Sequence, residues 1–236
     1  MGKIRLFCLP YAGGSAMVYT KWKDYLHEDI ELCPVELAGR GMRFREPRYE
    51  QFEDVVEDLY HMMKDRLDDR PYAIYGHSFG CFAAYELAHK LQASHHQNPQ
   101  HLFFAARRAP QVFKDEIPYH NLSMDELKNV LLRLGGTPQE LFENKEMMNA
   151  FLPILLSDFR VLHYYRYQER ADKLACAISA LSGKEDRDIS GQDLTAWKVH
   201  SEVGCRIYKV NGGHFFLNEH PEEVAGIINQ TLELWG

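Results

Sequence analysis

A serine with the surroundings of a catalytic nucleophile lies at Ser78, within Gly76-His-Ser-Phe-Gly80. A short apolar run, Tyr72-Ala-Ile-Tyr75, precedes it and is typical of a buried strand, and helical spacing resumes from Phe79. At such a strand–turn–helix junction the serine adopts a strained backbone conformation that projects its hydroxyl from the sheet, and the flanking glycines leave room for the chain. The pattern also arises by chance, so an ordinary turn that carries a serine remains the alternative for this motif alone.

A base and an acid follow the serine in the chain. A serine hydroxyl needs a base to remove its proton, and that base must be oriented by a third group. His214 follows the last expected strand in a Gly-Gly-His turn, with His220 as a competitor that directly precedes a helix-starting proline. Asp186 follows the preceding strand, and Asp188 is the second candidate. Serine, acid and histidine therefore occur in an order that predicts a catalytic triad of Ser78, Asp186 and His214.

Backbone amides that could stabilise an oxyanion come from two places. The helix that begins after Ser78 directs its first N–H groups, including that of Phe79, at the serine. The loop Pro10-Tyr-Ala-Gly-Gly14 follows the first expected strand, and its position favours the amide of Ala12 as the second donor. A glycine turn that leads into a helix is the alternative for this loop.

The elements that must position these residues alternate as strand and helix, which predicts an α/β domain with a mostly parallel central sheet and helices on both faces. The other expected strands are 4–9, 30–35, 102–106, 176–181 and 205–210. About seventy residues before the fifth strand carry helix signals, including Ser123-x-x-Glu126 and Thr137-Pro-Gln-Glu140 as capping boxes. We expect a single domain, 1–236, with a helical lid insertion at about 111–170.

The longest helical pattern in the insertion runs from about Lys145 to Tyr167, with Pro153 as an expected kink or break. Its apolar stripe is either plain core or the lining of an acyl pocket. The members of that stripe are Met147, Met148, Phe151, Leu152, Leu155, Leu156, Phe159 and Leu162.

Four arginines gather in the loop after the second expected strand, at positions 40, 43, 45 and 48. In an acidic protein this patch could meet an anionic partner. The alternative is a solvated loop in which arginines pair with Glu46 and Glu50.

Composition narrows the class of protein. The chain has 236 residues and a net charge of −7, which argues against nucleic-acid binding. It shows neither a membrane-length apolar run nor a signal-peptide pattern. Five cysteines, an odd number without close pairs, indicate free thiols in the cytoplasm. Neither metal-ligand spacing nor a dinucleotide or phosphate loop is evident, so we expect no metal and no cofactor, and a monomer by default.

Several motifs together resemble those of the type II thioesterases, stand-alone α/β-hydrolases associated with non-ribosomal peptide and polyketide synthetases. They span Ile4 to the C-terminal helix: Pro10-Tyr-Ala-Gly-Gly, Gly76-His-Ser-Phe-Gly, Arg107-Arg-Ala-Pro, Gly183-Lys-Glu-Asp186 and Gly212-Gly-His-Phe-Phe-Leu217. The resemblance implies an α/β-hydrolase fold, a triad of Ser78, Asp186 and His214, and oxyanion donors at Ala12 and Phe79. It also implies hydrolysis of stalled or misprimed acyl and aminoacyl groups from the phosphopantetheine arm of carrier domains.

Some positions depart from the commonest family pattern. Phe79 stands where methionine is frequent, which keeps the backbone N–H but alters the acyl pocket. A general carboxylesterase or lipase, a medium-chain acyl thioesterase and a non-catalytic carrier-binding module remain alternatives. Reactivity of Ser78 towards a fluorophosphonate would exclude the last of these.

Overall fold

The fold is organised around one six-stranded sheet. A computed structural model describes residues 3–114, 117–136 and 139–233. The strands lie in the order β2-β1-β3-β4-β5-β6, and every neighbouring pair is parallel. Their bounds are β1 Ile4–Leu9, β2 Ile30–Pro34, β3 Tyr72–His77, β4 His101–Ala105, β5 Ala177–Gly183 and β6 Cys205–Val210. The predicted strands are all present, with ends that differ by at most two residues.

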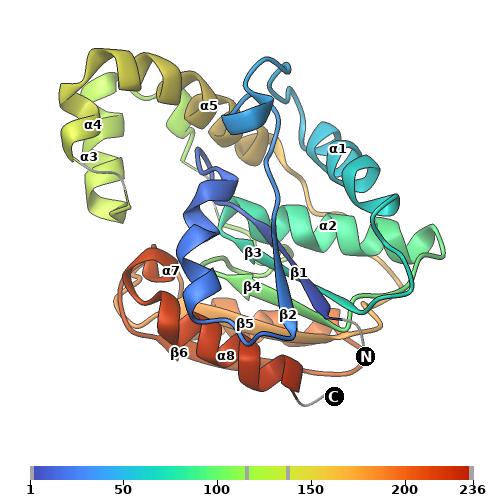
Figure 1. Cartoon of the computed structure of the whole chain (residues 1–236). Coiled ribbons are helices and arrows are strands. Elements are labelled where there is room, and N and C mark those ends of the chain that lie inside the picture. Colours follow the sequence, from blue (N-terminus) through green and yellow to red (C-terminus); the bar gives the residue numbers. More distant parts are fainter. Residues whose placement is uncertain (1–2, 115–116, 137–138, 234–236) are drawn as a thin grey trace.

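Helical segments cover both faces of the sheet, as predicted (Figure 1). Helices α1 (Phe52–Lys64) and α2 (Phe79–Ala93) lie on one face. The 3₁₀ helix η1 (Ala16–Asp24) and α8 (Pro221–Glu233) lie on the other. The remaining segments are η2 Gly41–Arg43, η3 Tyr119–Asn121, α6 Gly191–Thr195, η4 Ala196–His200 and α7 Phe216–Glu219.

Three helices fill the segment between β4 and β5: α3 (Met124–Leu134), α4 (Gln139–Glu143) and α5 (Lys145–Tyr164). They project beyond the sheet on the side where its strands end (Figure 1). The capping box at Ser123 and Glu126 is confirmed, because each residue's side chain accepts a hydrogen bond from the other's backbone N–H. The capping box expected at Thr137 includes residues that lie outside the described part of the chain. Of the kink or break expected at Pro153, the break is excluded, since α5 continues through this residue.

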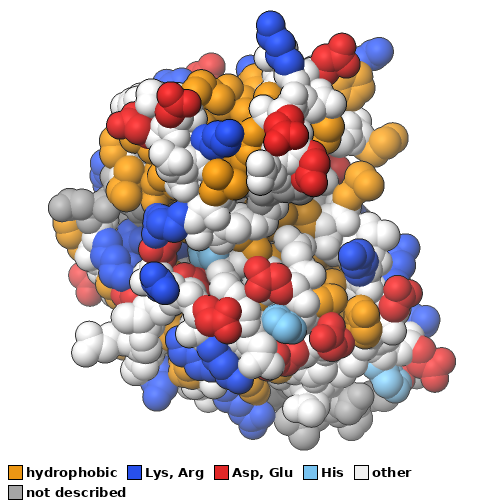
Figure 2. Space-filling model, turned by 90° about the vertical axis from the view of Figure 1, so that its left-hand side faces the viewer, with side chains coloured by type: hydrophobic (Ala, Val, Ile, Leu, Met, Phe, Trp, Pro, Cys, Tyr) orange, Lys and Arg blue, Asp and Glu red, His pale blue; other side chains and the backbone are white. Residues whose placement is uncertain are grey.

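The face of the molecule that carries α3, α4 and α7 is hollowed between the helices of the insertion and the body below them (Figure 2). Apolar side chains gather on the upper part of this face, among charges of both signs. The pocket described below is lined by residues from the insertion and from the body.

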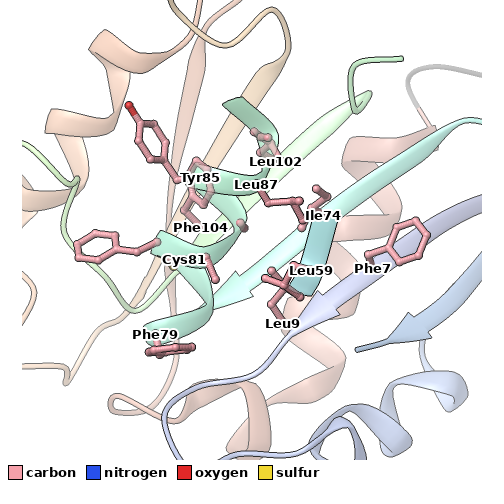
Figure 3. Packing of buried hydrophobic residues seen from close by; sticks show 14 of the residues in the cluster. Phe7, Leu9, Leu59, Ile74, Phe79, Cys81, Tyr85, Leu87, Leu102 and Phe104 are labelled. Atoms are coloured by element: carbon pink, nitrogen blue, oxygen red, sulfur yellow. The ribbon is translucent and has the colours of Figure 1, made fainter. Parts of the chain in front are cut away.

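The central strands are buried on both faces, as their continuous apolar runs predict. In β3, Tyr72 and Ile74 join the apolar cluster beneath α1 and α2, whereas Ala73 and Tyr75 join the cluster beneath η1 and α8. Figure 3 shows the first cluster, to which Leu59 of α1, Ile74 of β3 and Leu9 of β1 all belong. The sheet is therefore a rigid platform for the loops at the carboxyl ends of its strands, where ligands bind in open α/β sheets.

No helix in the described ranges is long and apolar enough to cross a bilayer. The five cysteines are free thiols, in agreement with the prediction, and four of them are buried.

Candidate active site

Ser78 lies at the sharp turn between β3 and α2. Its backbone has φ 52° and ψ −107°, a strained conformation for a residue other than glycine. It occupies the N-cap position of α2, yet its side chain makes no capping hydrogen bond. A Cβ added at Gly76 would lie 2.2 Å from the carbonyl oxygen of Gly80, and one at Gly80 would lie 2.4 Å from that of Leu9. Both glycines are therefore required for the turn, which leaves the serine hydroxyl available for chemistry.

The structure brings Asp186 and His214 together, although 28 residues separate them. The Nδ1 atom of His214 lies 2.9 Å from Oδ2 of Asp186. The other carboxylate oxygen of Asp186 accepts the backbone N–H of Asp188 at 3.0 Å. Burial raises the pKa of Asp186, but the hydrogen bonds from the His214 ring and the Asp188 backbone, with the nearby imidazoles, outweigh it, so the pKa stays below its usual value. The carboxylate is thus ionised and directed at the imidazole.

Close backbone packing holds the loops of these two residues together. A Cβ at Gly183, the last residue of β5, would lie 2.2 Å from the carbonyl oxygen of Gly213. The N–H of Glu185 also donates to the carbonyl of Gly212 at 3.1 Å. The glycines that precede both functional side chains therefore allow the loops after β5 and β6 to touch.

His77, the residue before Ser78, hydrogen-bonds the backbone of the loop that carries His214. Its ring is fully buried, and its Nε2–H donates to the carbonyl of His214 at 2.8 Å, while the hydroxyl of Tyr75 donates to Nδ1 at 3.2 Å. Burial lowers the pKa of His77 to about 3, so the ring is neutral. These contacts make His77 a structural support for the loop of His214, and its neutral ring is not placed to act as a second base.

Buried neutral histidines make the stability sensitive to acid. Burial also lowers the pKa of His101, at the start of β4, to about 4. Between pH 6.5 and 4 an unfolded histidine takes up a proton that folded His101 does not, so stability is full above pH 6.5 and is lost as the pH falls. We expect this residue to contribute up to about 1.4 kcal/mol per pH unit to that loss.

Urea unfolding of wild type and His101→Gln at pH 7.5, 6 and 5 tests this expectation. The variant should show a shallower decline in the free energy of unfolding. His61→Gln, at an exposed position, should keep the wild-type slope. Equal slopes for wild type and His101→Gln would contradict the expectation.

The two alternative site residues point elsewhere. Asp188 pairs with Arg133 of α3, with 3.1 Å between Oδ1 and the guanidinium. His220 lies at the start of α8 and faces Glu222 at 4.0 Å. Neither of them lines the pocket that contains Ser78 and His214.

A pocket of about 200 Å³ contains Ser78, His214 and Ala12. Ala12 lies in the loop after β1, and the N–H of Phe79 belongs to the first turn of α2, where amides have no carbonyl partner within the helix. The rest of the pocket is mostly apolar, with lining residues that include Val18, Leu131, Leu134, Leu141, Phe151, Leu155 and Phe159. Of the stripe predicted on α5, Phe151, Leu155 and Phe159 line this pocket, whereas Met148 and Leu162 are buried elsewhere. An apolar chain can therefore lie along α5 with its polar end at Ser78.

Residues 4–232 match the thioesterase domain family. The chain belongs to this family. Three relatives show how similar the chain is to proteins of this kind. ClbQ from the colibactin NRPS/PKS pathway is 38% identical, with a TM-score of 0.93 over 100% of both chains. The type II thioesterase BorB from the borrelidin biosynthetic cluster is 32% identical, with a TM-score of 0.87 over 98% of this chain and 93% of BorB. The gramicidin S biosynthesis protein GrsT of Aneurinibacillus migulanus is 34% identical over 98% of this chain and 90% of GrsT.

The resemblance to type II thioesterases is confirmed by these comparisons, together with the α/β-hydrolase fold. The thioesterase is accordingly a serine-dependent thioester hydrolase. In the described residues, no group of three or more His, Cys, Asp or Glu side chains is arranged to hold a metal ion.

The arginine loop of the thioesterase differs from the surface patch that the sequence indicated. Arg40 is 3% exposed and forms a bidentate ion pair with Asp158 of α5. Arg43 pairs with Asp58 at 2.8 Å and with Glu46. The pairing with Glu46 was anticipated, whereas a docking role for Arg40 is wrong because its guanidinium is buried. The sequence alone did not reveal this, since its partner lies 118 residues away.

Proposed function

We propose that this thioesterase hydrolyses stalled or misprimed acyl and aminoacyl groups from the 4′-phosphopantetheine arm of carrier domains in a non-ribosomal peptide or polyketide synthetase. The observation that carries the proposal is the apolar pocket that ends at Ser78 beside the hydrogen-bonded pair of Asp186 and His214. The pathway of ClbQ and the type II class of BorB support the same role.

The proposed mechanism assigns a role to each residue of the site. His214, held by Asp186, takes the proton of Ser78, whose oxygen attacks the thioester carbonyl carbon. The amides of Phe79 and Ala12 stabilise the oxyanion of the tetrahedral intermediate. The intermediate collapses with loss of the pantetheine thiol, which takes the proton from His214. A water molecule, as His214 takes its proton, then attacks the acyl-serine carbonyl; the bond to the Ser78 oxygen breaks, that oxygen takes the proton back from His214, and the acid is released.

The remaining parts of the proposal concern organisation and partners. Residues 1–236 form one domain in which segment 111–170 acts as the lid. The partners are acyl- or peptidyl-carrier domains, the enzyme acts as a monomer in the cytoplasm, and it requires no cofactor. The free cysteines support that location.

Release of acetyl groups from a loaded carrier domain, followed by intact-protein mass spectrometry, tests this function. The same acyl group is offered in parallel on free pantetheine and on a simple ester. We expect faster release from the carrier than from either small substrate, because docking of the carrier lowers the entropic cost of binding the arm. Equal or faster hydrolysis of the simple ester would instead identify a general carboxylesterase, and a steep preference for one longer acyl length would identify a medium-chain thioesterase.

A further inference from the structure

A buried carboxylate from the insertion holds the loop after β1. Asp158 of α5 is 1% exposed. Its Oδ2 accepts the backbone N–H of Gly13 at 2.8 Å and a guanidinium N–H of Arg40 at 2.7 Å, and its Oδ1 accepts a second N–H of Arg40 at 2.7 Å. The carboxylate thus has three hydrogen bonds and an opposite charge, which a buried ion requires.

Arg40 fixes the same loop at a second point. Its guanidinium donates to the carbonyl of Gly14 at 3.1 Å. The N–H of Gly14 donates in turn to the carbonyl of Tyr11 at 2.9 Å, which closes a tight turn over Tyr11, Ala12 and Gly13. The Tyr11 carbonyl shares a planar peptide unit with the N–H of Ala12, so fixing the carbonyl also fixes the direction of that N–H.

Side-chain packing presses the turn against α5. Gly13 has φ +76°, and a Cβ there would lie 2.9 Å from the ring of Phe151 and 3.0 Å from Leu155. Phe151, Leu155 and Asp158 follow one another at i, i+4 and i+7, which places them on one side of α5. One surface of the helix therefore supplies an apolar contact and a hydrogen-bond acceptor to the same glycine.

We infer that Asp158 is a positioning residue for catalysis: it fixes the Gly13 turn so that the Ala12 N–H points at the oxyanion, and Arg40 neutralises its charge. This inference rests on the proposed function, which assigns the oxyanion to Ala12 and Phe79. An unpaired carboxylate at this place would repel the developing negative charge. The ion pair lets a strong acceptor lie there without that penalty.

A pair of double variants separates positioning from folding. The asparagine double variant is Arg40→Met/Asp158→Asn, and the leucine double variant is Arg40→Met/Asp158→Leu. Both remove the ion pair with side chains of similar size, and apolar replacement of a buried pair is often tolerated. They differ in one respect, because asparagine keeps an oxygen that can accept the Gly13 N–H and leucine has none. Ser157→Ala serves as a further control, since it removes only a bond from α5 to the carbonyl of Tyr49.

The readouts are kcat and KM for acetyl-pantetheine hydrolysis, the inhibition constant of a trifluoromethyl ketone analogue, and the melting temperature. The serine oxygen adds to the ketone carbonyl and forms a tetrahedral oxyanion. The affinity for this inhibitor therefore reports how well the oxyanion site stabilises the negative charge. Relative to the asparagine double variant, the leucine double variant should lose about 10- to 100-fold in kcat and a similar factor in inhibitor affinity, with little change in KM. Ser157→Ala should keep wild-type values.

Equal kcat and equal inhibitor affinity in the two double variants would overturn the inference, and so would a change confined to KM. If the leucine double variant does not fold, hydrogen exchange in the wild type decides: a protected Gly13 amide supports the bond to Asp158, and rapid exchange of that amide contradicts it. Failure of the proposed function gives a different result: the wild type would release the carrier-bound acetyl group no faster than the simple ester, or Ser78→Ala would keep activity. Failure of this inference alone leaves Ser78→Ala inactive and the double variants equal.

Discussion

Replacing Ser78 with alanine is expected to lower the turnover of a carrier-bound thioester by at least about 10³- to 10⁴-fold. The side chain provides the atom that the proposed mechanism joins to the acyl group, and no neighbouring group replaces it. Stability should change little. The hydroxyl makes no capping bond, and alanine has the same difficulty as serine with the backbone conformation at this position.

Intact-protein mass spectrometry measures both release of the acyl group and formation of the acyl-enzyme. A fluorophosphonate should add one label to the wild type and none to Ser78→Ala. Ser94→Ala, at the exposed other end of α2, is the matched control and should behave as the wild type. Undiminished turnover by Ser78→Ala would remove the basis for the whole mechanism.

Replacing Asp186 with asparagine should lower turnover by about 10³- to 10⁴-fold, whereas Asp188→Asn should cost less than about 10-fold. Asp186 contacts Nδ1 of His214 at 2.9 Å and keeps the imidazole in the tautomer whose Nε2 can accept a proton. An asparagine amide directed at Nδ1 would favour the opposite tautomer. Asp188 offers only its backbone N–H to this arrangement and directs its carboxylate at Arg133.

The two variants form their own matched pair, because each removes one negative charge from the same loop. Steady-state hydrolysis of acetyl-pantetheine at pH 7.5, with thermal melting to verify folding, ranks them. The reverse ranking would identify Asp188 as the acid of the triad. The loop after β5 would then have to rearrange on substrate binding.

The parts of the site that the sequence predicted are those set by local geometry. Ser78 is recognisable because a strand, two glycines and a helix must follow one another closely in the chain. Asp186 and His214 could be proposed because parallel strands end at one edge of a sheet, so residues that directly follow β5 and β6 meet there. The sequence favoured Asp186 over Asp188 as the acid, and the contact of Asp186 with His214 agrees with that preference.

The features that the sequence could not indicate depend on how the insertion lies on the body. Arg40 lies among other arginines in a loop, which indicates a solvated or docking surface until its partner on α5 is known. Asp158 lies in an apolar stripe, where an acidic residue gives no sign of what it binds. Pro153 weakens a helix in isolation, but α5 continues through it while packing against Gly13 and the loop of Tyr49. Tertiary contacts therefore decided each of these points against the local pattern.

The shared surface of Phe151 and Leu155 has a consequence for how substrate preference can diversify. These side chains bound the acyl pocket and also support the Gly13 turn, so a smaller residue that admits a bulkier acyl group would loosen the turn as well. Substitutions at Phe151 or Leu155 therefore change the substrate specificity and the reaction rate together. Leu131 of α3 also borders the pocket but packs in the same buried cluster as Leu155. Leu134 borders the pocket and belongs neither to that cluster nor to the nearest neighbours of Gly13. Selection, or an engineer, can therefore vary the accepted chain length through Leu134 with less effect on the turn than through Phe151 or Leu155.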